Sequence, residues 1–162
     1  MADFVTVQVK ASKNVIDAMV NSVPGHDFEG LVDFNCIVPT PAYVYQGEGD
    51  LIERENRGEW TWHSWNNRFW GCKWNAAETL RRSDGSIYFT AADKPREYLL
   101  ALSAAFPQED IFVRFAGETG YAYAGYESYR QGMIIENSHL VMGFRSPEMK
   151  RFGYKVRNRL YA

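Results

Sequence analysis

The chain has few of the residues from which metal sites and catalytic sites are usually built. Its 162 residues include two cysteines, Cys36 and Cys72, and three histidines, His26, His63 and His139. Cysteines this few and this far apart form neither a disulfide framework nor a zinc site, and they fit reduced thiols in a cytoplasm. None of the histidines stands in an HExxH pattern. We therefore expect no metal site.

Signatures of phosphate binding and of membrane insertion are also missing. The sequence contains neither GxxxxGK[ST] nor GxGxxG, and the glycine pairs of residues 47–49 and 117–120 enclose glutamates where an anion would have to approach. No apolar run approaches the roughly 20 residues that a membrane span needs, and the first ten residues lack the apolar stretch of a signal peptide. We expect a cytoplasmic protein that needs no cofactor, and the absence of catalytic spacing favours a non-enzymatic role.

What the sequence does contain is typical of one soluble globular domain. It is 46% hydrophobic and 23% charged, and a chain of this length can fold around its own core without disulfides or metals. Charge is distributed unevenly, because residues 145–162 carry six basic side chains and one glutamate, a net +5 that leaves −7 for the other 144 residues. This basic C-terminus either meets an acidic partner or balances the acidic surface of the body.

Patterns of apolar residues predict two strand–helix–strand units. The elements expected, in order, are strand 4–10, helix 12–23, strand 31–38, strand 86–90, helix 95–106 and strand 111–115. Short strands are expected at 121–126, 129–136 and 140–144, and the alternation of residues 152–161 favours a basic edge strand over a helix. We predict a single α+β domain over residues 1–162, with a ferredoxin-like sandwich in which helices cover one face of a mostly antiparallel sheet. The C-terminal extension begins at about residue 127.

An insertion of about residues 42–82 separates the two units. Residues 42–59 hold five carboxylates against two arginines and are expected to be an exposed acidic segment. All the tryptophans then follow within fifteen residues, and residues 76–82 are expected to form a short helix. Trp62, Trp65 and Phe69 share one helical face, which favours core packing. Exposed tryptophans are instead typical of interface hot spots.

Four sequence blocks resemble a known family. They are residues 34–41 (FNCIVPTP), 69–75 (FWGCKWN), 88–95 (YFTAADKP) and 115–120 (FAGETG). In that order they resemble the blocks of the YubB-like family of plasmids and bacteriophages, and the second block is the most specific. Ala92 and Asp93 depart from the family's usual Trp-Ser pair, and the start of the chain and its basic C-terminus have no counterpart. The resemblance implies a ferredoxin-like domain from a mobile element, in a family without an assigned activity.

The leading hypothesis is a binding protein that acts on a host protein, as an inhibitor of a host defence complex of the anti-CRISPR or anti-restriction type would. Acidic side chains beside tryptophans would combine steering charges with aromatic anchors. The candidate partner-binding residues are Trp60, Trp62, Trp70, Glu48, Asp50, Glu53 and Glu55. Trp74 is expected to pack the insertion against the core, with the stem of Lys73 beside it.

An alternative hypothesis is single-stranded nucleic-acid binding. A ferredoxin-like sheet can stack bases on exposed aromatics, for which this chain offers Tyr88, Phe112, Tyr121, Tyr123, Tyr126 and Tyr129. The candidate nucleic-acid-binding residues are Lys155, Arg157, Arg159, Tyr121 and Tyr123. The acidic body repels phosphate and no RNP signature is present, so nucleic acid ranks behind a protein as the partner. An enzyme with an unfamiliar site ranks third.

Overall fold

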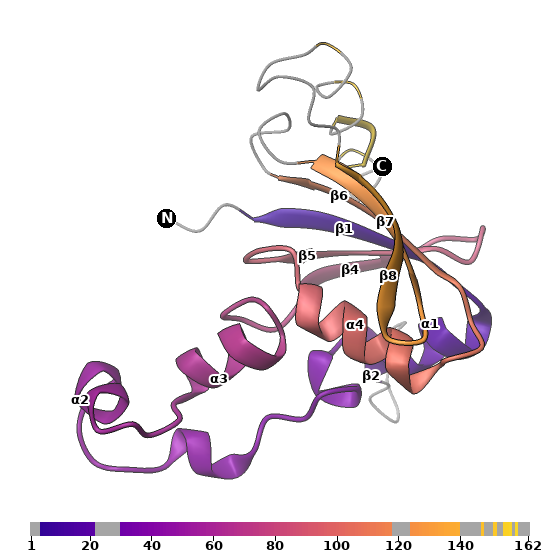
Figure 1. Cartoon of the computed structure of the whole chain (residues 1–162). Helices are drawn as coiled ribbons and strands as arrows, with labels where there is room; N and C mark the ends of the chain where they lie inside the picture. Colours follow the sequence, from indigo (N-terminus) through magenta and orange to yellow (C-terminus); the bar gives the residue numbers. More distant parts are fainter. Residues whose placement is uncertain are drawn as a thin grey trace.

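The computed structural model describes residues 4–21, 30–117, 124–139, 147, 151, 154–156 and 158. Its main element is a six-stranded sheet in which every neighbouring pair is antiparallel (Figure 1). Across the sheet the order is β4-β5-β1-β6-β7-β8. The bounds are β1 (Val5–Lys10), β4 (Ala77–Arg81), β5 (Ile87–Ala91), β6 (Ile111–Gly117), β7 (Ala124–Arg130) and β8 (Met133–His139). The protein is thus an α+β fold built on a large antiparallel sheet.

Two helices, α1 (Lys13–Met19) and α4 (Arg96–Ala105), lie on one side of this sheet (Figure 1). They bury the apolar stripes that the sequence predicts, including Ile16 on α1 and Leu99 on α4. A separate two-stranded ribbon, β2 (Val20–Asn21) with β3 (Leu31–Val32), follows α1. The residues that pack between the helices and the sheet form one continuous core. The predicted strands 4–10, 86–90 and 111–115 and the predicted helix 95–106 are therefore present near their expected bounds. The helix expected at 12–23 ends at Met19, and four further predictions need correction.

The strand expected at 31–38 is wrong, because β3 ends at Val32 and a 3-10 turn, η1 (Phe34–Cys36), follows. The Asp33 side chain accepts a hydrogen bond from the Asn35 backbone N–H at 2.9 Å, which starts this turn. The helix expected at 76–82 is also wrong, because those residues form β4 and pair with β5 across a tight turn at residues 83–85. Strand pairing here overrides the local helical pattern.

The predictions for the end of the chain need correction too. The strand expected at 129–136 is split by a turn, where Gln131 and Gly132 have φ angles of 51° and 72° between β7 and β8. Residues 151, 154–156 and 158 are helical and not an edge strand. This helical turn buries Val156 against the sheet and leaves Lys155 exposed, a pattern that alternation along the sequence cannot distinguish from a strand. The strand expected at 140–144 lies outside the described residues.

The insertion, expected at about residues 42–82, lies between Asp33 and Asn75 in the structure, because residues 77–81 belong to the sheet as β4. It comprises η1, the 3-10 turn η2 (Ala42–Tyr45), and the helices α2 (Leu51–Asn56) and α3 (Trp62–Phe69). Its two ends are joined at the base, where the Asp33 carboxylate accepts a hydrogen bond from Asn75 Nδ2 at 2.7 Å. Asn75 Oδ1 in turn accepts the Phe34 N–H at 2.8 Å. These partly buried hydrogen bonds fix the path of the chain into and out of the insertion. Beyond this base the insertion projects away from the sheet (Figure 1).

Trp70 docks the insertion onto the core. Its ring is 2% exposed and meets Phe34 edge-on at 5.5 Å, and its indole N–H donates to the Val38 carbonyl at 2.9 Å. The Trp70 carbonyl accepts the Tyr98 N–H of α4 at 3.2 Å. Gly71 follows with a φ of +83°, and a Cβ there would lie 2.9 Å from the Arg96 backbone nitrogen. Only glycine permits so close an approach to α4.

The packing role expected of Trp74 is therefore carried by Trp70. Trp74 is 45% exposed, stacks on Phe4 at 6.3 Å, and carries the Lys73 ammonium over its ring at 4.2 Å. Among the described residues, no helix is long and apolar enough to cross a membrane.

Candidate partner-binding site

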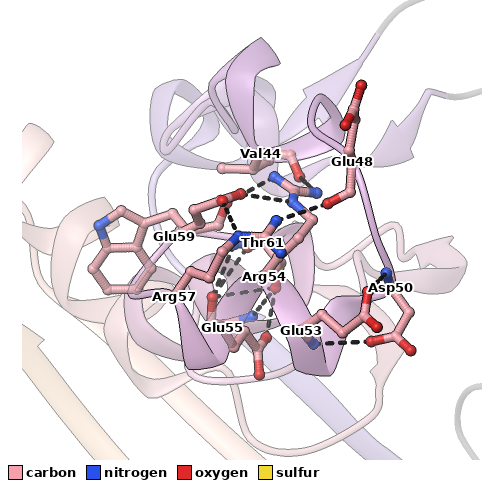
Figure 2. Close-up of polar contacts among 11 residues, drawn as sticks. Val44, Glu48, Asp50, Glu53, Arg54, Glu55, Arg57, Glu59 and Thr61 are labelled. Atoms are coloured by element: carbon pink, nitrogen blue, oxygen red, sulfur yellow. Dashed lines mark hydrogen bonds and ion pairs between the residues drawn. The ribbon is translucent and has the colours of Figure 1, made fainter.

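The acidic part of the insertion, residues 42–69, folds into a small lobe made of η2, α2 and α3, which we call the acidic lobe. Figure 1 shows it at the far end of the insertion, on the side of the sheet that carries α4. Polar contacts link the residues of its first half (Figure 2), beside the buried side chain of Val44. The lobe is therefore best understood from its charges.

Arg54 is the centre of this polar network. Arg54 is 6% exposed. Its guanidinium donates hydrogen bonds to the Val44 and Trp60 carbonyls, both at 3.3 Å, and to the Glu59 carboxylate at 3.1 Å (Figure 2). A buried charge is tolerated only when it is paired and hydrogen-bonded, as here. Gly47 has a φ of +125°, and a Cβ there would lie 2.8 Å from Arg54 Nε. Arg54 thus ties η2, α2 and the start of α3 into one body.

Arg57, the other arginine of residues 42–59, is also hydrogen-bonded within the lobe, although its side chain is 50% exposed. It donates to the Glu48 carbonyl at 2.7 Å and to the Glu59 carboxylate at 2.8 Å. Hydrogen bonds from Arg57 and Arg54 lower the pKa of Glu59 below its ordinary value. One carboxylate, Glu59, therefore takes up both cations of this segment.

Asp50 and Glu53 form the capping box of α2. Asp50 Oδ1 accepts the Glu53 N–H at 2.9 Å, and Glu53 Oε2 accepts the Asp50 N–H at 3.2 Å. Both carboxylates thus accept backbone donors at the start of the helix, where acidic residues are favourable. Glu48, Asp50 and Glu53 are all exposed, and none of them forms a salt bridge with a cation in the part of the chain that the structure describes.

Glu55 joins α2 to α3. It accepts a hydrogen bond from the Thr61 hydroxyl at 2.6 Å and lies 3.6 Å from His63 Nδ1. The Thr61 hydrogen bond, with a smaller contribution from the charge of His63, lowers the pKa of Glu55. Thr61 and Ser64 form the capping box of α3, so Glu55 supports the cap that begins this helix.

Large apolar side chains stand exposed among these charges. The exposed fractions are 53% for Tyr43, 63% for Tyr45, 71% for Ile52 and 43% for Trp60. The Trp60 ring lies 5.6 Å from that of Phe69, which is itself 38% exposed. Apolar groups that gather on a surface with a polar rim are typical of protein interaction sites. Tyr43, Tyr45 and Ile52 were not candidates from the sequence; the available signal was large apolar residues in a segment too charged to be buried.

The structure separates the tryptophans that the sequence grouped as partner-binding. Trp60 is exposed, whereas Trp62 is half-buried against the core. Trp70 was a wrong candidate, because its ring is buried at the base of the insertion. The helical spacing of Trp62, Trp65 and Phe69 does form α3, in which Trp65 is 6% exposed and Phe69, at the C-terminal end, is 38% exposed. Binding by the exposed members stays a prediction.

The candidates for nucleic-acid binding have mixed positions. Lys155 is described and exposed, whereas Tyr121, Tyr123, Arg157 and Arg159 lie outside the described residues. Of the other aromatics considered, Tyr88 and Tyr129 are fully buried and cannot stack on a ligand. Phe112 and Tyr126 are 52% and 39% exposed.

Cys72, the buried cysteine, lies in surroundings that do not activate a nucleophile. Burial, with a smaller contribution from the charge of Asp93, raises the pKa of Cys72 to about 12. The thiol therefore stays protonated at neutral pH and is a poor nucleophile. Within the described ranges, His, Cys, Asp and Glu side chains form no group of three that could hold a metal ion.

No family model and no curated protein matches the chain. One solved structure, protein api92 from Yersinia pseudotuberculosis of the DUF1281 family, is similar with a TM-score of 0.45 and 19% sequence identity. The matched region covers 68% of this chain and 40% of the length of that protein. At this TM-score the likeness supports no conclusion about function.

Proposed function

We propose that the chain is a non-enzymatic binding protein whose acidic lobe docks onto a cationic surface of a protein partner. The observation that carries the proposal is that Arg54 and Arg57 hydrogen-bond to Glu59 and to backbone carbonyls, which leaves Glu48, Asp50 and Glu53 exposed and without a salt bridge among the described residues. Residues 42–59 hold five carboxylates and two arginines, a net charge of −3. A surface of one sign attracts partners of the opposite sign and speeds their encounter.

Exposed apolar groups supply the binding free energy that charge alone does not provide. Rim charges mainly set the association rate, whereas buried aromatic and aliphatic anchors hold the complex together. Tyr45, Ile52 and Trp60 are large enough for this role and are exposed beside the carboxylates. We therefore assign them as anchors and the three outward carboxylates as steering groups.

The fold and the origin of the chain are part of the same proposal. The order β4-β5-β1-β6, with α1 and α4 on one side, supports a ferredoxin-like core, because two interleaved strand–helix–strand units produce that order. The four sequence blocks support membership of the YubB-like family and an origin in a plasmid or bacteriophage. A host defence complex in the cytoplasm is then a fitting partner, since its nucleic-acid channel is cationic and an acidic lobe can occupy it.

The test compares two double variants that change the net charge equally. Glu48→Gln/Glu53→Gln alters the lobe but keeps amide oxygens for the α2 cap, and Glu109→Gln/Glu136→Gln alters carboxylates outside it. Capture from a nuclease-treated bacterial lysate identifies the partner, and association is then measured with purified components at low and high salt. We expect the lobe variant to associate several-fold more slowly at low salt and the control variant to resemble wild type.

Two results would refute this function. Equal slowing by both variants would show that total charge, and not the lobe, attracts the partner. Failure of heparin, a soluble polyanion, to displace the partner would show that the partner's surface is not cationic. Each of these substitutions should change the free energy of unfolding by no more than about 0.5 kcal/mol, since exposed substitutions change stability little.

A further inference from the structure

The face of the sheet opposite α1 and α4 carries exposed aromatics beside cations. Along β6, Ile111, Val113 and Phe115 face the helices and are buried, so Phe112 and Arg114 point to the other side. Phe112 is 52% exposed and stands opposite Lys10 of β1 in the register.

The next row of the sheet repeats this combination. Arg114 stands opposite Tyr126 of β7, which is 39% exposed. Arg114 Nε donates to Gln8 Oε1 at 2.5 Å, which holds the guanidinium along the sheet surface. Two aromatic side chains on adjacent strands, each opposite a cation, thus form a flat platform.

The basic C-terminal segment reaches this same face. Val156 is buried in a small cluster with Ala116 and Ala124, which pair with each other on β6 and β7. These alanines lie two residues beyond Arg114 and two before Tyr126, on the same side of the sheet. Lys155 is therefore exposed at the margin of the platform. The nucleic-acid hypothesis drawn from the sequence already combines sheet aromatics with the basic end, and the contact of Val156 with Ala116 and Ala124 supports that combination.

We propose that this face binds single-stranded nucleic acid, with bases stacked on Phe112 and Tyr126 and phosphates close to Lys10, Arg114 and Lys155. Stacking requires unpaired bases, which a duplex does not offer, and the interleaved cations match a phosphate backbone. Glu136, opposite Ser128 in the register, marks the boundary of the site on the β8 side. The site is separate from the acidic lobe, so this inference goes beyond the proposed function.

The experiment measures fluorescence anisotropy of labelled oligo-dT and oligo-rU of about 12 nucleotides, the length that one such platform spans. Phe112→Ala/Tyr126→Ala should weaken binding about tenfold or more, because each stacked base contributes strongly. Lys155→Gln should lower the slope of log affinity against log salt by about 0.7, the value for one phosphate contact on a single strand. Tyr43→Ala/Tyr45→Ala, a matched pair of exposed aromatics on the lobe, should bind like wild type.

Several results would overturn the proposal. One is the absence of binding to either oligomer at about 50 mM salt, where phosphate contacts are strongest. Another is that Phe112→Ala/Tyr126→Ala binds the oligomers with the affinity of wild type. The third is that the wild-type protein binds a duplex of the same sequence as tightly as the single strand. Lys155 is exposed, so its variant tests the site even if the double variant unfolds. Failure here leaves the proposed function untouched, because partner association is measured after nuclease treatment and depends on the lobe.

Discussion

A buried ion pair on the helix side of the sheet gives the sharpest test of the fold. Lys94 Nζ lies 2.5 Å from Glu127 Oε1, and the two side chains are 7% and 1% exposed. The Tyr129 hydroxyl donates to the other oxygen of Glu127, and Lys94 Nζ lies 4.5 Å from the centre of the Phe115 ring. Through these contacts β7 holds the loop that leads into α4.

Lys94→Met should destabilise the protein by about 3–5 kcal/mol, because removing one partner leaves the other charge buried without its counterion. Glu127→Leu should cost at least as much, since it also takes away the acceptor of the Tyr129 hydroxyl, a further loss of about 1–3 kcal/mol. The double variant should be more stable than either single one, because apolar replacement of both ions is often neutral. Burial this complete means that solvent does not screen the pair appreciably.

The assay is urea unfolding of wild type, both single variants and the double variant, followed as a double-mutant cycle. A coupling energy near zero would refute the reasoning, because it would show that the two charges are solvated independently. A loss of unfolding free energy below about 1 kcal/mol for Lys94→Met would also refute the reasoning, since an exposed ion pair contributes that little. Tyr129→Phe serves as a milder control, with an expected loss of about 1–2 kcal/mol.

Four other variants test separate parts of the structure. Trp70→Ala should lower stability by about 3–5 kcal/mol in urea unfolding, whereas Trp74→Ala, at an exposed ring, should cost less than about 1 kcal/mol. Trp60→Ala should leave the melting temperature within about 2 °C of wild type but speed dissociation of the lobe's partner. Burial alone would raise the pKa of Asp33, but hydrogen bonds from Asn75 and Asn35 outweigh it and lower the pKa. Its contribution to stability is therefore complete above about pH 4 and lost as pH falls through the lowered pKa, and Asp33→Asn should remove that acid dependence.

Sequence patterns correctly located the strands and helices that have strong apolar periodicity and a buried face. The alternating valines of β1 and the apolar stripe of α4 are both as expected. Even there, β1 is buried on both faces, because Thr6 and Gln8, which alternate with the valines, are only 4% and 6% exposed. The strand also lies between β5 and β6 in the sheet. Position within a sheet is set by distant pairing and is not encoded in the period of one strand.

The insertion shows why side-chain roles were harder to predict than elements. Helical spacing describes Trp62 and Trp65 on α3, but Trp70 caps the end of that helix, where periodicity carries no information. Its burial depends on Phe34 and Val38, more than thirty residues earlier in the chain. No local pattern predicts such a contact.

The same contacts explain why residues 69–75 form a distinctive block. Trp70 fills the core and receives Tyr98, Gly71 allows the close approach to α4, and Asn75 holds Asp33 at the opposite end of the insertion. Each residue performs a task that another side chain cannot, since a smaller ring would leave a cavity, a Cβ would collide with α4, and an apolar group would orphan buried donors. The block is therefore a structural clamp that presents the acidic lobe at a fixed distance from the sheet. In the proposed function, the exposed residues of the lobe determine partner specificity, and their substitution leaves this clamp intact.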